Sequence, residues 1–176
     1  MQEDILIKNL KNVATQETAF SELVSNYKER LYWHIRRIVL DHDDTDDVLQ
    51  NTFIKVFQNI NSFKEESAVY TWLYRIATNE ALSFLKKKAT IFNTSSEELQ
   101  SFLVENLKAD VYFDGDEIQL KLQQAIASLP EKQRLVFNMK YYEEMKYEDI
   151  SKILDTSVGG LKASYHHAVK KIEAFL

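Results

Sequence analysis

The chain has 176 residues, of which 45% are hydrophobic and 12% aromatic, and this composition excludes a disordered chain and suits one compact domain or two small ones. Its 3 glycines and 1 proline argue against a β-sandwich or barrel, and the absence of cysteine excludes disulfides, thiolate zinc sites and a cysteine nucleophile. The net charge of −5 argues against a uniformly basic domain, but acids concentrate in residues 41–47 and 97–117, whereas lysines gather at 86–88 and 162–171. We therefore predict an all-α protein with two local basic surfaces.

The beginning of the chain indicates where the protein works. Residues 1–12 carry acids where a secretory signal has basic residues, and no apolar run approaches the roughly 20 residues that a membrane span needs. We expect no membrane insertion and a cytoplasmic location.

Apolar residues at three- and four-residue spacing predict three amphipathic helices in the first half, after a short one near residues 5–10. The first runs from Thr18 to about Val39, and the second follows N-cap candidates in the acidic run. A polar loop at 59–69 precedes the third helix, which ends at Lys88. We assign residues 1–88 to the first domain.

Periodicity weakens in residues 89–116, where serine, threonine, asparagine and acids dominate. We expect a flexible acidic linker there, which can include one docked helical turn.

Helical patterns return in residues 117–176, our second domain. Ser128-Leu129-Pro130-Glu131 is typical of a helix start, because proline is favoured early in a helix and Glu follows Ser by three residues. A short apolar segment at 147–154, a turn at 155–157 and a longer final helix then predict a helix-turn-helix.

The final helix can enter a DNA major groove if Ser157 caps it. Gly159 and Gly160 each cost about 1 kcal/mol relative to alanine inside a helix, and close approach to DNA is one reason to keep them. A small helical domain can also contain such a corner without binding DNA, so both interpretations stay open. The candidate DNA contacts off the apolar stripe are Lys162, Ser164, His166, His167 and Lys170.

The third helix mixes aromatics, amides and cations in a way that suits single-stranded DNA. The alternative is that its aromatics pack inward and its terminal lysines complement the helix dipole. The candidate residues are Tyr70, Trp72, Tyr74, Arg75, Asn79, Ser83, Lys86 and Lys87.

No pattern supports catalysis or a bound cofactor. Measured from Asp41, the glycine position of a calcium loop holds Asp46 and the twelfth position holds Thr52, so the acidic run is better explained as a helix cap. We find no nucleophile beside a histidine and no glycine-rich phosphate loop. We predict no enzyme, metal site or cofactor.

Three segments resemble the extracytoplasmic-function (ECF) RNA polymerase sigma factors. Residues 43–53 resemble the signature of sigma region two, and 71–79 resemble the promoter-melting segment that follows it. Residues 129–162 are similar to sigma region four. The resemblance implies a factor that brings polymerase core to promoters and is held inactive by an anti-sigma factor.

The resemblance also implies roles for individual residues. Asp47, Gln50 and Ile54 would face the clamp of the largest polymerase subunit. The loop 61–69 and Asn79 would capture flipped bases of the minus-ten element. The candidates on the final helix would contact the minus-thirty-five duplex, although the family often has arginine in place of Ser164 and another basic residue in place of His167.

Two other classes of protein remain open. A helix-turn-helix regulator with a helical sensor domain would bind operators unaided, as a dimer. In a helical adaptor that binds only proteins, neither lysine cluster would matter.

Overall fold

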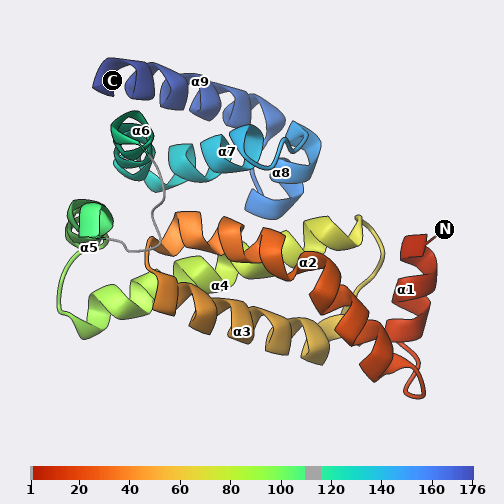
Figure 1. Cartoon of the computed structure of the whole chain (residues 1–176). Coiled ribbons are helices and arrows are strands. Elements are labelled where there is room, and N and C mark those ends of the chain that lie inside the picture. The colour runs from red at the N-terminus through yellow and green to blue at the C-terminus, as the bar shows by residue number, and fades with distance from the viewer. Residues whose placement is uncertain (1, 110–115) are drawn as a thin grey trace.

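A computed structural model describes residues 2–109 and 116–176, and within these ranges all regular secondary structure is helical (Figure 1). This confirms the predicted all-α class. The elements in chain order are α1 (Gln2–Leu10), α2 (Gln16–Val39), α3 (His42–Asn59), the 3-10 turn η1 (Ile60–Ser62), α4 (Val69–Ile91), α5 (Ser96–Glu105), the 3-10 turn η2 (Asn106–Ala109), α6 (Glu117–Ala127), α7 (Glu131–Tyr141), α8 (Tyr147–Leu154) and α9 (Val158–Phe175).

The first unit is a bundle in which α2, α3 and α4 bury their apolar stripes against one another. The acidic run begins α3 as a cap, because the Asp41 carboxylate accepts a hydrogen bond from the Asp44 backbone N–H at 2.9 Å. Acids in the first turn also favour a helix start electrostatically. The run is therefore explained without a metal.

The short helix α1 fixes the loop between α3 and α4. A Glu3 carboxylate oxygen accepts a hydrogen bond from the Val69 backbone N–H at 2.6 Å, at the start of α4. The Lys11 ammonium donates to the Phe63 carbonyl at 2.9 Å and pairs with Glu65 at 2.7 Å. The sequence pattern gave no sign of these contacts.

The segment predicted as a linker contains more ordered structure than one helical turn. A capping box between Ser95 and Glu98 starts α5, and this helix buries Leu99 and Leu103 beside Ala89. The Gln100 amide donates to the Leu129 carbonyl at 3.0 Å, which ties α5 to the C-terminal helices. Gly115, which we placed in the linker, lies outside the described residues.

The last helices form the predicted helix-turn-helix. Asp155 adopts a left-handed backbone with φ of 50° and ends α8, and the Ser157 hydroxyl accepts a hydrogen bond from the Gly160 N–H at 3.2 Å to start α9. Burial of Ile150, Leu161 and their neighbours fixes α8 and α9 against α7.

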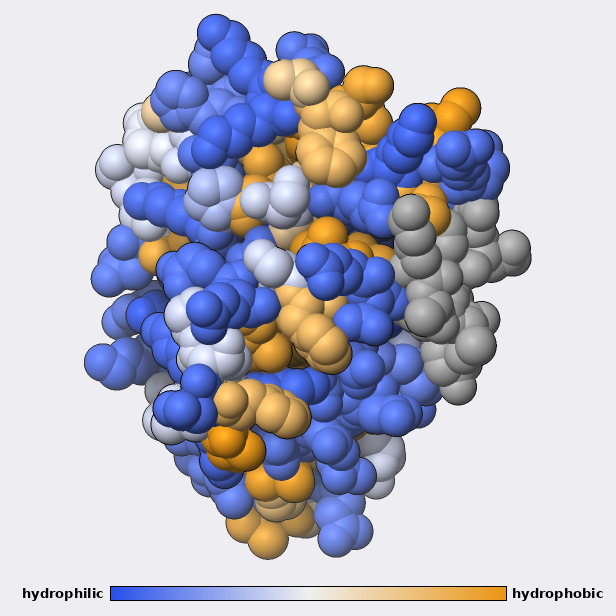
Figure 2. All heavy atoms as spheres, turned by 90° about the vertical axis from the view of Figure 1, so that its left-hand side faces the viewer, coloured by the Kyte–Doolittle hydropathy of each residue, from blue (hydrophilic) through white to orange (hydrophobic). Residues whose placement is uncertain are grey.

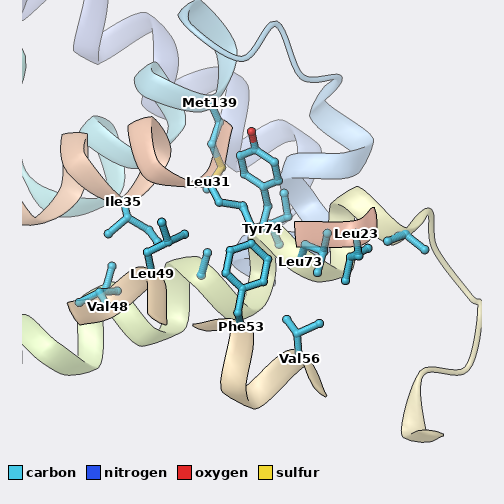
Figure 3. Packing of buried hydrophobic residues seen from close by; sticks show 14 of the residues in the cluster. Leu23, Leu31, Ile35, Val48, Leu49, Phe53, Val56, Leu73, Tyr74 and Met139 are labelled. Carbon is cyan, nitrogen blue, oxygen red and sulfur yellow. The ribbon is translucent and has the colours of Figure 1, made fainter. Parts of the chain in front are cut away.

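The C-terminal helices pack directly on the first unit, and buried residues of both form one continuous core. In Figure 3 the Met139 side chain reaches from the C-terminal helices toward Leu31, and the Tyr74 hydroxyl points away from Phe53 toward those same helices. Leu31, Tyr74 and Met139 are all fully buried. The two units therefore share apolar surface as well as a tether.

Polar side chains also connect the two units. We call Arg37, Tyr74 and Glu143 the Glu143 cluster. The Glu143 carboxylate accepts hydrogen bonds from Arg37 at 2.9 Å and from the Tyr74 hydroxyl at 2.8 Å. Burial, and then the charge of Glu143, raise the pKa of Tyr74, so the phenol stays protonated and can donate. The Arg37 guanidinium also lies 4.2 Å from the Tyr142 ring centroid.

Beneath the Glu143 cluster, His34 lies in the core of the first unit. Its Nε2 is 2.8 Å from the Thr78 hydroxyl, which itself donates to the Tyr74 carbonyl at 2.7 Å. Because the Thr78 hydroxyl proton is used in the bond to the Tyr74 carbonyl, the hydroxyl oxygen can only accept from His34, and Nε2–H is the donor. Burial, followed by the charge of Arg37, lowers the pKa of His34 to about 3, so the ring is neutral at ordinary pH.

Candidate protein and nucleic-acid interfaces

A groove of about 980 Å³ lies between α2 and α3. Gln50 and Ile54 line it, and Asp47 lies one turn earlier on the same face of α3, where all three side chains are exposed. The structure thus brings together the three residues predicted to bind polymerase.

The aromatic side chains of Phe20, Phe53 and Phe57 line this groove. The Phe20 ring centroid lies 5.0 Å from that of Phe57 and 6.3 Å from that of Phe53. Ile54 is 50% exposed and Phe57 41% exposed. Their spacing of three residues, at the edge of the apolar stripe of α3, was the available signal.

The candidate single-strand face of α4 is only partly as predicted. Asn79, Ser83, Lys86 and Lys87 are exposed and share one side of the helix at spacings of four, three and one residues. Lys88 instead pairs with Asp44, across the ends of α4 and α3.

The aromatic candidates of α4 mostly point elsewhere. Tyr74 belongs to the Glu143 cluster, and the Tyr70 hydroxyl donates to the Asp149 carboxylate on α8. The Trp72 ring packs against Phe63 in a tilted arrangement, with centroids 4.9 Å apart, and Phe63 is buried. In this arrangement the cations and amides of α4 face outward while these aromatics support the fold.

Asn79 opens into a cleft of about 290 Å³ that α4 shares with the C-terminal helices. Arg75 lines the same cleft, opposite Lys132 of α7 and Asp155 of the helix-turn-helix corner. The lining of this cleft therefore comes from both units.

The outer face of α9 carries most of the predicted duplex contacts. Lys162, His166 and Lys170 recur every four residues along one exposed stripe, and His167 is exposed beside it, with its ring centroid 6.0 Å from that of His166. Ser164 is half-buried and lies toward the packed side of the helix, off this stripe. The structure thus groups four of the five candidates.

Other exposed apolar side chains are scattered. Figure 2 views the side on which α5 and α6 lie, and apolar surface there forms separate patches among hydrophilic atoms. Phe102 on α5 and Ile118 on α6 are 60% and 72% exposed. Single exposed apolar residues are ordinary on protein surfaces.

Within residues 2–109 and 116–176, no three histidine, aspartate or glutamate side chains lie together in a way that could hold a metal ion. Among the helices of those same ranges, none combines the length and the apolar composition of a membrane span.

Comparisons with known proteins agree with the two-part organisation. Residues 23–91 match the family description for sigma-70 region 2, and residues 119–172 match that for sigma-70 region 4. The ECF RNA polymerase sigma factor SigW of Bacillus subtilis is 31% identical to this chain, covering 93% of this chain and 92% of SigW. The ECF RNA polymerase sigma-E factor of Haemophilus influenzae is 33% identical, covering 88% and 86% of the two chains.

Two solved structures share the fold at 19% sequence identity. CnrH in complex with the cytosolic domain of CnrY superposes with a TM-score of 0.70, covering 98% of this chain and 95% of CnrH. The sigma factor RpoE in complex with the anti-sigma factor NepR from Bartonella quintana gives 0.69, covering 89% and 95%. With both sigma-70 regions matched in order and relatives aligned over nearly their full length, the chain belongs to the ECF RNA polymerase sigma factors of the sigma-70 family.

Proposed function

We propose that this chain binds RNA polymerase core through the α2–α3 groove and directs it to two-part promoters. Residues 1–88 act as sigma region two, residues 117–176 act as region four, and 89–116 join them. The observation that carries the proposal is the exposed stripe of Asp47, Gln50 and Ile54 beside an aromatic groove floor. Such a surface combines an apolar anchor with polar groups that fix orientation, as protein interfaces commonly do.

The clamp of the largest polymerase subunit is the partner that we assign to this groove. Ile54 supplies an apolar side chain that is half exposed in the free protein. Asp47 and Gln50 flank it with a charge and an amide, which favour one orientation of the partner.

Promoter DNA is the partner that we assign to α4 and α9. The outer stripe of α9, with Lys162, His166 and Lys170, fits the phosphates and base edges of the minus-thirty-five duplex. On α4, Asn79 and Ser83 offer hydrogen bonds to separated bases of the minus-ten element, while Lys86 and Lys87 neutralise phosphates.

An anti-sigma factor is the third partner. CnrH, which shares this fold, was solved in complex with the cytosolic domain of CnrY. RpoE, which also shares it, was solved in complex with the anti-sigma factor NepR. A partner that covers the α2–α3 groove would exclude polymerase by occupying the same surface. The chain acts as a non-enzymatic initiation factor without a cofactor, in the cytoplasm, where polymerase works.

Run-off transcription on a fragmented genomic library tests the proposal, with bacterial core polymerase and with or without the protein. We expect new start sites that share a two-part upstream motif. Ile54→Glu should abolish core binding and these starts, because it places a charge on the apolar anchor. Asn51→Glu is the matched control, since Asn51 is exposed on α3 and does not line the groove.

Unaided binding to specific operators, with no gain of initiation by core, would instead identify a helix-turn-helix regulator. Equal core binding by Ile54→Glu and the parent protein would remove the groove from the proposed interface.

A further inference from the structure

Two glycines occupy the first turn of α9, and the structure separates their roles. Neither Gly159 nor Gly160 has a positive φ, so neither is needed for its backbone conformation. Glycine lowers the stability of a helix relative to alanine. Each glycine therefore needs another explanation.

The explanation for Gly160 lies within the chain. A Cβ atom at this position would lie 3.2 Å from the Ser157 hydroxyl oxygen and 3.4 Å from the Thr156 methyl carbon. The Ser157 hydroxyl caps α9 through the Gly160 N–H. A side chain at Gly160 would thus crowd the helix cap.

Within residues 2–109 and 116–176, no contact explains Gly159. A Cβ atom there would meet no atom within 4 Å, and the residue is exposed. Gly159 precedes Lys162 by three residues and His166 by seven, which places it on the same exposed stripe of α9. The open space thus lies on the face that carries the cations.

We infer that Gly159 is a point of close approach between α9 and the sugar-phosphate backbone of duplex DNA. The missing side chain lets the backbone of the first helical turn reach the duplex, while Lys162 and His166 contact it one and two turns further along. Recognition helices contact DNA mainly through their N-terminal turns, so a methyl group here would hold the whole stripe away from the groove. This inference rests on the proposed function, because it names a further contact of the same promoter-binding face.

The test compares Gly159→Ala with Gly160→Ala in the full chain. We expect Gly159→Ala to raise the Tm of the free protein and to leave its affinity for core polymerase unchanged. Its affinity for a promoter fragment in the holoenzyme should fall about tenfold, as expected for loss of a hydrogen bond to a charged group. Gly160→Ala should instead lower the Tm, because its methyl group meets the cap.

Full promoter affinity of the Gly159→Ala holoenzyme would overturn the inference, and so would a lower Tm of this variant, since the glycine would then serve the fold. Failure of the proposed function is a separate outcome, because the unmodified protein would then give no promoter-dependent initiation with core. A Gly159→Leu variant extends the comparison, since its affinity loss should exceed that of alanine if close approach is the cause.

Discussion

Replacing Glu143 by glutamine tests how firmly the two units are joined. The substitution keeps the shape of the side chain but removes the charge that Arg37 and the Tyr74 hydroxyl contact. A hydrogen bond to a charged group contributes about 1.5–3 kcal/mol. The Glu143 side chain is 10% exposed and that of Arg37 is 22% exposed, so solvent screening keeps the loss below the 3–5 kcal/mol typical of breaking a fully buried pair.

We therefore expect a loss of about 2 kcal/mol in docking free energy, which raises the ratio of separated to docked molecules about thirtyfold. Because the chain lacks cysteine, Gln58→Cys and Lys171→Cys provide the only two labelling sites for energy-transfer measurements along a urea titration. Both positions are exposed, on α3 and α9. The Glu143→Gln protein should lose energy transfer at lower urea than the parent.

Glu144→Gln is the matched control, because it makes the same charge change at the next residue, which is exposed. If the two variants lost energy transfer at the same urea concentration, the Glu143 cluster would contribute nothing to docking, and apolar packing alone would join the units.

Two further predictions concern pH and salt. The pKa of His34 is lowered to about 3 in the native state, so the unfolded chain takes up this proton first as pH falls below about 6.5, and stability drops between these values. His34 should make the free energy of unfolding, measured in urea, about 1.4 kcal/mol lower at pH 5.5 than at pH 7.5. The His34→Gln variant should lack this difference. If the variant and the parent protein showed the same pH dependence of stability, the low native pKa of His34 would be refuted. On α9, Lys162→Ala and Lys170→Ala should each reduce the salt slope of promoter binding by about one unit, whereas exposed Lys152→Ala on α8 should leave it unchanged. An unchanged slope in both α9 variants would remove this stripe from the DNA interface.

The helices of both units could be predicted from sequence because each carries a continuous apolar stripe, and side-chain caps at Asp41 and Ser157 start α3 and α9. The cap expected from Ser128 and Glu131 is absent: Pro130 is the N-cap of α7, and the Ser128 hydroxyl instead donates to the Ala125 carbonyl at 2.8 Å, at the end of α6. The helix α5 was underestimated because its apolar residues are few and lie among serines and acids. Its capping box at Ser95 and Glu98 was nevertheless a readable signal. Its burial depends on Leu85 and Ala89 of α4 and on Leu40, the residue that ends α2, and no local pattern describes this surface.

The candidate interfaces also include features that the sequence could predict and features that it could not. Spacing along one helix placed Lys162, His166 and Lys170 on a common stripe, because helix geometry is local. The same spacing could not show whether Tyr70 and Tyr74 face DNA or another part of the chain, because an exposed position and a position between two domains have the same sequence pattern. Their partners Asp149 and Glu143 are more than sixty residues away.

The contacts of α1 have a practical consequence for handling this protein. Glu3 and Lys11 brace the loop that the family resemblance assigns to separated promoter bases, so the first residues are part of that loop's support. Removing the first residues, or fusing a tag directly to them, would disturb contacts that hold the loop before α4, more than fifty residues away in sequence. The C-terminal residue Leu176 is exposed beyond the end of α9, and an affinity tag there leaves this brace intact.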